Sequence, residues 1–393
     1  MSDEQHGLPQ RLSEVRALAK LSQSDLAGKL GVSASLISHW EKGTRTPSES
    51  QLLELARAMG VALDYLLNAE IRPLFKCRAQ VTSPQKNEIE QALRDASSQV
   101  HFVATAHRLA GKMPKPFILR ADFGSTEALP GAAAHLRDTL KLNRCVTLGE
   151  LKQALAEWNI FVFDWFMPQH LSGISFRGAF SVIFINRQQP PTRRLFTLAH
   201  EFAHVVFHLG RDGETSQNRM DAQVSISSHR DPLEKQANAF ASEFLMPEAD
   251  LKLLVDKYGD RLREAGMLEA AARTFNVSRD AIFYRLTQLK FFKWSERVKY
   301  FHGNYPLPAA PTVRVAPEAK NAGEIDSQVD VRFREMALAL YQEGQVSVGK
   351  LAEWFFTPRH VLEEYIAKLR EPDEQVISDE PVPIEEGEPA EAA

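Results

Sequence analysis

The stretch that decides the fold is Thr197-Leu-Ala-His200-Glu201-Phe-Ala-His204, within an apolar segment from Thr192 to Leu209. Residues four apart in an α-helix lie about one turn apart on one side, so both imidazoles can reach the same ion. The glutamate after the first histidine projects toward the water that such an ion holds, and can take its proton. The stretch therefore predicts a catalytic metal site with His200 and His204 as ligands and Glu201 as the general base.

A third ligand is needed, because two histidines and a glutamate can also meet this spacing by chance in a chain with 12 histidines. Glu234-Lys-Gln-Ala-Asn238-Ala-Phe-Ala begins an apolar helix after a polar loop long enough to fold back. A glutamate in the first turn of a helix is also favoured by the helix dipole. Paired with the first helix, however, Glu234 completes a His₂Glu set for Zn²⁺, and Asn238 can orient one histidine. Mn²⁺ and Fe²⁺ also suit these ligands.

Two further histidines have weaker claims on the site. His208 lies two helical turns beyond His200, which is too far for both to bind one ion, so it is predicted to be structural or to orient a ligand. His229 lies in the polar segment 211–231, which is predicted to be a loop. It is predicted to be a solvated loop residue, the alternative being a group that stabilises a tetrahedral oxyanion.

Together these motifs resemble the ImmA/IrrE family of bacterial metallopeptidases. The resemblance rests on the 197–204 stretch, on the E-x-x-A-N-x-F-A pattern from Glu234, and on Leu245-Met-Pro. Phe275-Asn-Val-Ser-Arg-Asp-Ala-Ile-Phe-Tyr-Arg-Leu also resembles the helix-turn-helix-like stretch that this family places after its catalytic helices. With an N-terminal helix-turn-helix the match would cover residues 11 to 368. Phe202 and Ala203 stand where many members have an aliphatic residue and a glycine, which should not disturb the metal.

This resemblance implies a zinc-dependent endopeptidase of thermolysin-like geometry whose known substrates are repressor proteins. By position, His200, His204 and Glu234 would be the ligands and Glu201 the base that activates water for amide hydrolysis. The apolar run Ser181–Ile185, just before the catalytic helix, is predicted to be the edge strand to which an extended substrate pairs.

A second motif occupies residues 21–47 and resembles the Xre (phage-repressor-like) helix-turn-helix. Gly31 supplies the tight turn and Ser33 caps the following helix. Leu36, Ile37 and Trp40 have the spacing that packs this helix onto the rest of a small bundle. The residues predicted to contact DNA are those left outward or placed at the helix ends, namely Gln23, Ser33, Ala34, Ser35, Ser38, His39, Lys42 and Arg45.

The charge balance qualifies this DNA interface. Residues 1–70 hold seven Lys and Arg against nine Asp and Glu, so non-specific affinity for DNA should be modest and salt-sensitive. Small helical bundles without DNA function share such apolar patterns, but the motif favours binding to a double-stranded operator. Domains of this type act on paired half-sites, which predicts a homodimer.

Composition indicates a cytoplasmic protein of two or three domains. The chain has 393 residues, a net charge of −4, 44% hydrophobic residues and only two cysteines, without a cysteine cluster. Its N-terminus lacks a signal sequence and its apolar runs are too short to cross a membrane, so no membrane partner is predicted.

The predicted fold class is α+β and mostly helical. It comprises an all-α helix-turn-helix bundle at 1–70, a zincin-like metallopeptidase domain with a small sheet at 71–300, and a linker with helices at 301–370. Residues 371–393 hold nine acidic and no basic residues, which predicts a disordered tail.

Two functions remain open at this point. The first is a DNA-binding transcriptional regulator that hydrolyses a peptide bond in a repressor-like protein or in itself. The alternative is a transcription factor whose metal site is structural or senses a ligand, without proteolysis. An intact Glu201 favours the first, because a structural site needs no base. An antitoxin of a toxin–antitoxin pair is a third possibility, which depends on a neighbouring gene.

Overall fold

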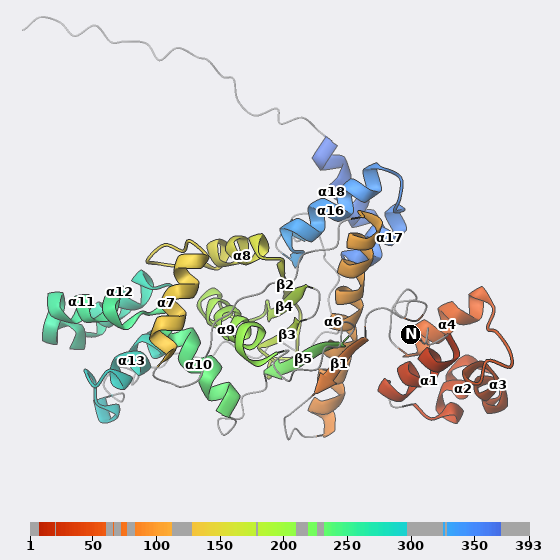
Figure 1. Ribbon diagram of the computed structural model, residues 1–393, viewed down its shortest axis with the longest axis horizontal. Helices are drawn as coiled ribbons and strands as arrows, with labels where there is room; N and C mark the ends of the chain where they lie inside the picture. The colour runs from red at the N-terminus through yellow and green to blue at the C-terminus, as the bar shows by residue number, and fades with distance from the viewer. Residues whose placement is uncertain are drawn as a thin grey trace, which may run out of the picture.

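The computed structural model describes residues 8–19, 21–59, 66, 72–76, 83–111, 128–177, 180–209, 219–225, 232–296, 325–326 and 328–370 (Figure 1). Several predictions lie outside these residues: His229, the linker predicted at the start of 301–370, and the acidic tail at 371–393. Among the described helices, none is long and apolar enough to cross a membrane.

The N-terminal bundle contains α1 (Leu8–Leu18), α2 (Gln23–Leu30), α3 (Ala34–Glu41) and α4 (Glu49–Met59). Ser22 begins α2 with a capping box to Asp25, and Ser33 accepts a hydrogen bond from the Leu36 amide to begin α3. The helices enclose a core of their own, which includes Leu26, Ile37, Trp40, Leu55 and Met59. This bundle lies to one side of the remaining elements (Figure 1).

The centre of the molecule is a five-stranded sheet in the order β1-β5-β3-β4-β2. Its strands are β1 (Arg72–Lys76), β2 (Ile160–Trp165), β3 (Gly173–Arg177), β4 (Ser181–Asn186) and β5 (Arg219–Ser225). β2 pairs with β4 in parallel, and β1 pairs with β5 in parallel. β3 is antiparallel to both of its neighbours, β4 and β5.

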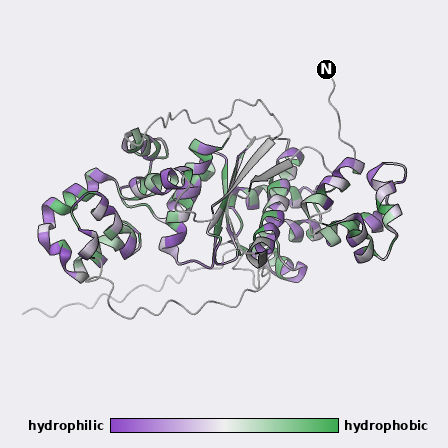
Figure 2. Ribbon diagram, turned by 90° about the horizontal axis from the view of Figure 1, so that it is seen from below, coloured by the Kyte–Doolittle hydropathy of each residue, from purple (hydrophilic) through white to green (hydrophobic). Residues whose placement is uncertain are grey.

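Alternate residues of β2 and β4 serve two hydrophobic clusters, because successive side chains of a strand point to opposite faces. Ile160, Val162, Ile183 and Ile185 face the catalytic side, whereas Phe161, Phe163, Val182 and Phe184 face the other. Both strands are buried throughout, which explains why they read as continuous apolar runs. Figure 2 shows the hydrophobic residues along these strands and the hydrophilic ones on the outward sides of the helices.

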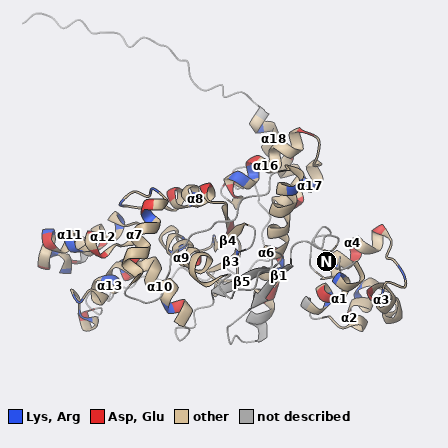
Figure 3. Cartoon of the chain, viewed as in Figure 1, with Lys and Arg blue, Asp and Glu red and all other residues tan. Residues whose placement is uncertain are grey.

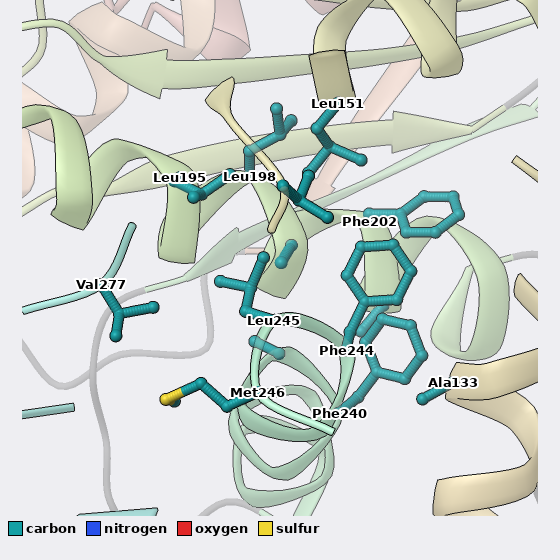
Figure 4. Close-up of a cluster of buried hydrophobic side chains, with 14 of the residues drawn as sticks. Ala133, Leu151, Leu195, Leu198, Phe202, Phe240, Phe244, Leu245, Met246 and Val277 are labelled. Carbon is teal, nitrogen blue, oxygen red and sulfur yellow. The ribbon is translucent and has the colours of Figure 1, made fainter. Parts of the chain in front are cut away.

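The catalytic side of the sheet is covered by α9 (Pro191–Ala203) and α10 (Pro232–Leu245), with α7 (Leu129–Thr139) and α8 (Leu148–Glu157) around them. Phe202 of α9 packs against Phe240 and Phe244 of α10, and Ala133 of α7 closes this cluster (Figure 4). α11 (Glu248–Tyr258), a 3₁₀ turn (Gly259–Arg263), α12 (Ala265–Thr274) and α13 (Arg279–Gln288) extend the same cluster. This packing fixes α10 against the catalytic helix.

The opposite face is covered by α6 (Ser83–Leu109) and by α16 (Val331–Gln342), α17 (Val348–Trp354) and α18 (Arg359–Arg370). Phe102 of α6, Phe333 of α16 and Trp354 of α17 meet in one buried cluster with the strands. The C-terminal helices therefore share a core with the sheet.

Several of the described helices end in one turn geometry, and in three helix pairs this turn closes on a buried alanine. These pairs are α2–α3, α12–α13 and α17–α18. In each, a backbone amide donates to the carbonyl of a buried alanine five residues earlier in the chain: Val32 to Ala27, Val277 to Ala272 and Thr357 to Ala352, each at 3.0 Å. The residue before each of these amides has a positive φ: Gly31 (65°), Asn276 (53°) and Phe356 (47°). The turns after α12 and α17 therefore end their helices in the same way as the turn after α2 does.

The predicted fold class, mostly helical α+β with a small sheet, is confirmed. Three details of the prediction are wrong. Ser181–Ile185 is not an edge, because β4 lies between β3 and β2. The expected loop 211–231 contains β5, and the helix expected from Thr192 to Leu209 changes to a π-helix at His204–His208. Strand order and pairing depend on distant partners, which the local pattern does not contain.

Candidate metal centre

Helix α9, which carries His200, Glu201 and His204, is positioned by the strand before it. β4 ends at Asn186, and α9 begins at Pro191 with Pro190 at its N-cap, where a missing amide hydrogen costs no helical bond. From Thr197 to Ala203 the helix is wholly buried, between the sheet and α10. The Asn186 amide donates to the carbonyls of Met167, Pro168 and Leu171, and so holds the loop that leads into β3.

The three predicted ligands converge on one point. The Nε2 atoms of His200 and His204 lie 3.1 Å apart, and the Glu234 carboxylate lies 3.2 Å from the first and 3.3 Å from the second. A tetrahedral zinc site with ligand bonds of about 2.0–2.1 Å has ligand–ligand edges of about 3.3 Å. The spacing and chemistry of these donors therefore fit a divalent ion. Among the described residues, this is the one group of three or more His, Cys, Asp or Glu side chains that could hold a metal ion.

Each histidine is oriented through its second ring nitrogen. His200 Nδ1 lies 3.0 Å from the Asn238 side-chain oxygen, one turn along α10 from Glu234. His204 Nδ1 lies 2.8 Å from His208 Nδ1, and His208 Nε2 lies 3.3 Å from the Gln236 side-chain oxygen. His208 thus supports a ligand and lies outside the ligand cluster. Such partners fix the tautomer and raise the basicity of a ligating imidazole.

Electrostatics favour an ionised Glu234. Burial opposes ionisation of Glu234, but hydrogen bonds from His200 and His204 outweigh it and hold the pKa of this carboxyl well below its usual range. Burial also opposes the charged form of His200, yet the contact with Glu234 leaves its pKa raised. Burial and the neighbouring His204 lower the pKa of His208 to about 4, so His208 is neutral at pH 7. A cation would take the place of the proton that Glu234 now stabilises.

Glu201 lies beneath β3 and is completely buried. Burial raises its pKa, and the two histidines act in the opposite direction. A side-chain carbon at Gly173 would lie 2.7 Å from the Glu201 Oε1 atom, so only a glycine leaves room for the base at this point of β3. A raised pKa favours a carboxyl group that can both accept a proton and return it.

β3 contributes residues to this site that no sequence motif indicated. Gly173, Ser175 and Arg177 point to the catalytic side, since Ile174 and Phe176 belong to the opposite cluster. The Arg177 guanidinium donates to the carbonyls of Val205 (2.7 Å) and Leu209 (3.1 Å), and so ties the π-helical turn to the sheet. A five-residue strand that contains glycine and arginine has little signal in sequence.

The predicted DNA-contact residues gather at α3 and its flanks. Ser35, His39, Lys42 and Arg45 are exposed, and Ala34 and Ser38 are partly so. Ser33 caps α3, and His39 Nδ1 lies 2.8 Å from the Thr44 hydroxyl. Gln23 is already engaged, because its amide donates to Glu41 at 2.7 Å.

Glu41 links the helices behind this face. Its carboxylate also pairs with Arg16 at 2.6 Å, and this contact raises the pKa of Arg16. Arg16 and Gln23 therefore brace α1 and α2 against α3. Figure 3 shows charges of both signs on the four-helix bundle, as the sequence count implies.

Comparisons with known proteins agree with this arrangement. Residues 159–287, which contain the metal cluster, match the IrrE N-terminal-like domain family, and residues 12–66 match the helix-turn-helix family. No solved structure matches the chain.

Two curated relatives match different parts of the chain. The radiation response metalloprotease IrrE of Deinococcus radiodurans is 31% identical over 189 residues, which are 48% of this chain and 49% of that protein. The HTH-type transcriptional regulator YqaE of Bacillus subtilis (strain 168) is 34% identical over 61 residues, 16% of this chain and 53% of that protein. The chain spans about half the length of each relative. The chain therefore joins a helix-turn-helix domain at residues 12–66 to an IrrE N-terminal-like domain at residues 159–287.

Proposed function

We propose that this protein is a DNA-binding transcriptional regulator whose second domain is a zinc-dependent endopeptidase. Its substrate is a repressor-like protein or the protein itself. The observation that carries the proposal is the convergence of His200, His204 and Glu234 within 4.8 Å, with Glu201 on the same helix turn. Of the two relatives, one is named a metalloprotease and the other an HTH-type transcriptional regulator, and they support the two halves of the proposal separately.

In the proposed reaction the chain's own residues hold the metal and move one proton. His200, His204 and Glu234 bind the ion, while Asn238 and His208 hold the two imidazoles in place. When bound, Zn²⁺ supplies Lewis-acid chemistry that lowers the pKa of water and polarises a peptide carbonyl. Glu201 accepts the proton of the attacking water and returns it to the leaving amine. Mn²⁺ and Fe²⁺ suit the same ligands.

The proposed DNA interface is the exposed part of α3 with its flanking turn. Ser33, Ala34, Ser35, Ser38 and His39 would face base edges, and Lys42 and Arg45 phosphates. Gln23 would approach the backbone while bonded to Glu41. We propose a homodimer on paired half-sites, with the peptidase unit at 71–300 joined to the DNA-binding unit at 1–70 and followed by a helical unit at 301–370 and a tail at 371–393.

The substitution Glu201→Gln tests the peptidase. It keeps the size of the side chain and removes the base, so we expect metal content to stay at the wild-type level while cleavage falls by roughly 10²–10⁴-fold. Metal is measured by mass spectrometry of the purified protein, and cleavage on proteins encoded beside this gene, with and without a chelator. Glu234→Gln is the matched comparison, in which the metal itself should be lost.

The alternative, a transcription factor whose metal site is structural or senses a ligand, gives a different result. Wild-type protein with one bound metal would then cleave none of the candidate proteins, with or without a chelator, and Glu201→Gln would behave like the wild type in every measurement.

A further inference from the structure

The edge of β3 that faces away from β4 is paired along its whole length with a segment of the same chain. Each residue of β3, from Gly173 to Arg177, lies opposite a residue of β5, from Ser225 back to Asp221. The pairing is antiparallel, and the other edge of β5 is paired with β1. β5 therefore has both of its edges satisfied.

This edge is the place where an extended polypeptide would meet the general base. Gly173 lies directly against Glu201, with a would-be side-chain carbon 2.7 Å from its Oε1 atom. Extended peptides bind sheets by adding a strand, since the main chain then satisfies its hydrogen bonds. The other edge of β3 is bonded to β4 within the core. A substrate that aligns with β3 beside Glu201 must therefore take the position of β5.

The burial of the site agrees with an occupied edge. Glu201 and His204 have 0% exposed surface, and His200 and Glu234 have 5% and 6%. A base and a metal that must meet a peptide bond need more room than this, so some segment has to move before a polypeptide can reach them. β5 is the strand whose removal would open β3.

We propose that β5 is an internal competitor of the substrate: it holds the substrate-binding edge of β3, and an extended polypeptide that replaces it, antiparallel to β3, opens the peptidase. This inference rests on the proposed peptidase function. The docking edge is then β3 and not Ser181–Ile185, which the sequence predicted. The substrate would bind as an extended strand and not as a helix or a folded surface.

The competition is strong because it is intramolecular. A tethered segment competes at an effective concentration of about millimolar. β1 adds to it by pairing with the outer edge of β5 in register, Arg72 with Arg219 through Lys76 with Gln223. β1 follows the DNA-binding bundle along the chain, since α4 ends at Met59 and β1 begins at Arg72. The strand that secures β5 is thus connected to the DNA-binding domain.

The test uses the full chain and a probe that reports strand exchange without cleavage. The probe is a fluorescein-labelled synthetic peptide with the sequence of residues 217–227, which contains β5. Binding is measured by fluorescence anisotropy in a Glu201→Gln background, where the peptide is not cut. The variant is A222P/Q223P. Successive amides of a strand point to opposite edges, so one of these two residues donates toward β3 and the other toward β1, and proline at both positions removes both donors. The matched control is Gln223→Ala, which keeps the backbone donor.

We expect the peptide to bind A222P/Q223P about tenfold or more tightly than its parent, since the tethered competitor is weakened. Gln223→Ala should bind like the parent. Hydrogen exchange should show the β3 amides that point toward β5 protected in the parent, exposed in the proline variant, and protected again when the peptide is added; the β3 amides that point toward β4 should stay protected throughout. Metal content checks that the fold is intact. If the proline variant does not fold, L74P/F75P in β1 loosens β5 from its outer side and should give a smaller gain.

Equal affinity for the parent and the proline variants, or no change in exchange at 173–177, would overturn the proposal. With Glu201 intact, A222P/Q223P should cleave a substrate faster than the wild type does. If peptide binding rises but no variant cleaves any protein, the strand exchange stands and the peptidase function fails. The two are therefore separable.

Discussion

At the scale of single residues, the site depends on one glycine as much as on its ligands. Gly173 allows β3 to pass over Glu201, where a side-chain carbon would lie 2.7 Å from Cγ and Oε1 and 2.9 Å from Cδ. Contacts this short cannot persist in a packed interior, so the base or the strand must shift. The ligands themselves do not contact this point. Gly173 therefore leaves room for Glu201, the proposed base, and does not touch the proposed metal ligands.

The substitution Gly173→Ala should separate these two roles. We expect cleavage to fall by about 10²-fold, as a displacement near 1 Å of a reacting group does, while metal content stays at the wild-type level. Cleavage rate and metal content are measured on the same preparation. Gly149→Ala is the control, because a side-chain carbon there meets nothing within 4 Å. A Gly173→Ala protein as active as the control would show that Glu201 does not need this space.

At the scale of elements, Asp330 joins a helix of the C-terminal region to the central sheet. Its carboxylate accepts hydrogen bonds from the amides of Arg332 (3.0 Å) and Phe333 (3.2 Å) at the start of α16, and from Val162 of β2 (2.9 Å). Burial raises the pKa of this carboxyl, and the three amides act in the opposite direction. One side chain thus caps a helix and anchors it to a strand far away in sequence.

Removing this carboxylate should destabilise the fold. Asp330→Ala leaves the Val162 amide buried without a partner and removes the cap, for a loss of about 2–4 kcal/mol in the free energy of unfolding. Asp330→Asn keeps an acceptor oxygen and should lose less. Urea unfolding followed by near-ultraviolet circular dichroism measures both. Equal losses for the two variants would mean that the charge, and not the acceptor, is what matters.

At the scale of the whole molecule, the helices after residue 325 complete the core of the sheet. Trp354 is fully buried, with its ring centroid 6.4 Å from that of Phe102 in α6 and 6.0 Å from that of Phe333 in α16. The four-helix bundle around Trp40 has a separate hydrophobic cluster. The molecule should therefore unfold as two units, one around the sheet and one for DNA binding.

Trp354→Ala tests this division. We expect it to cost the sheet unit about 3–5 kcal/mol in the free energy of unfolding, because it removes a large fully buried side chain. The bundle's own transition should not move. Trp294→Ala is the control, since Trp294 is 57% exposed and such surface changes stay within about 0.5 kcal/mol. Differential scanning calorimetry resolves the transitions, and an equal shift of both would contradict separate units.

The sequence by itself determined the parts that depend on helical spacing. His200 and His204 lie one turn apart on any α-helix, and Ser33 and Gly31 specify a cap and a turn within a few residues. The mostly helical class follows from the same short-range pattern. Only the tertiary structure decided the order of the strands, because a sheet joins residues that are distant along the chain. The places of β3 and β4 in the sheet depend on which strands pair with them. The edge beside Glu201, and the strand β5 that covers it, could therefore not be predicted from local sequence.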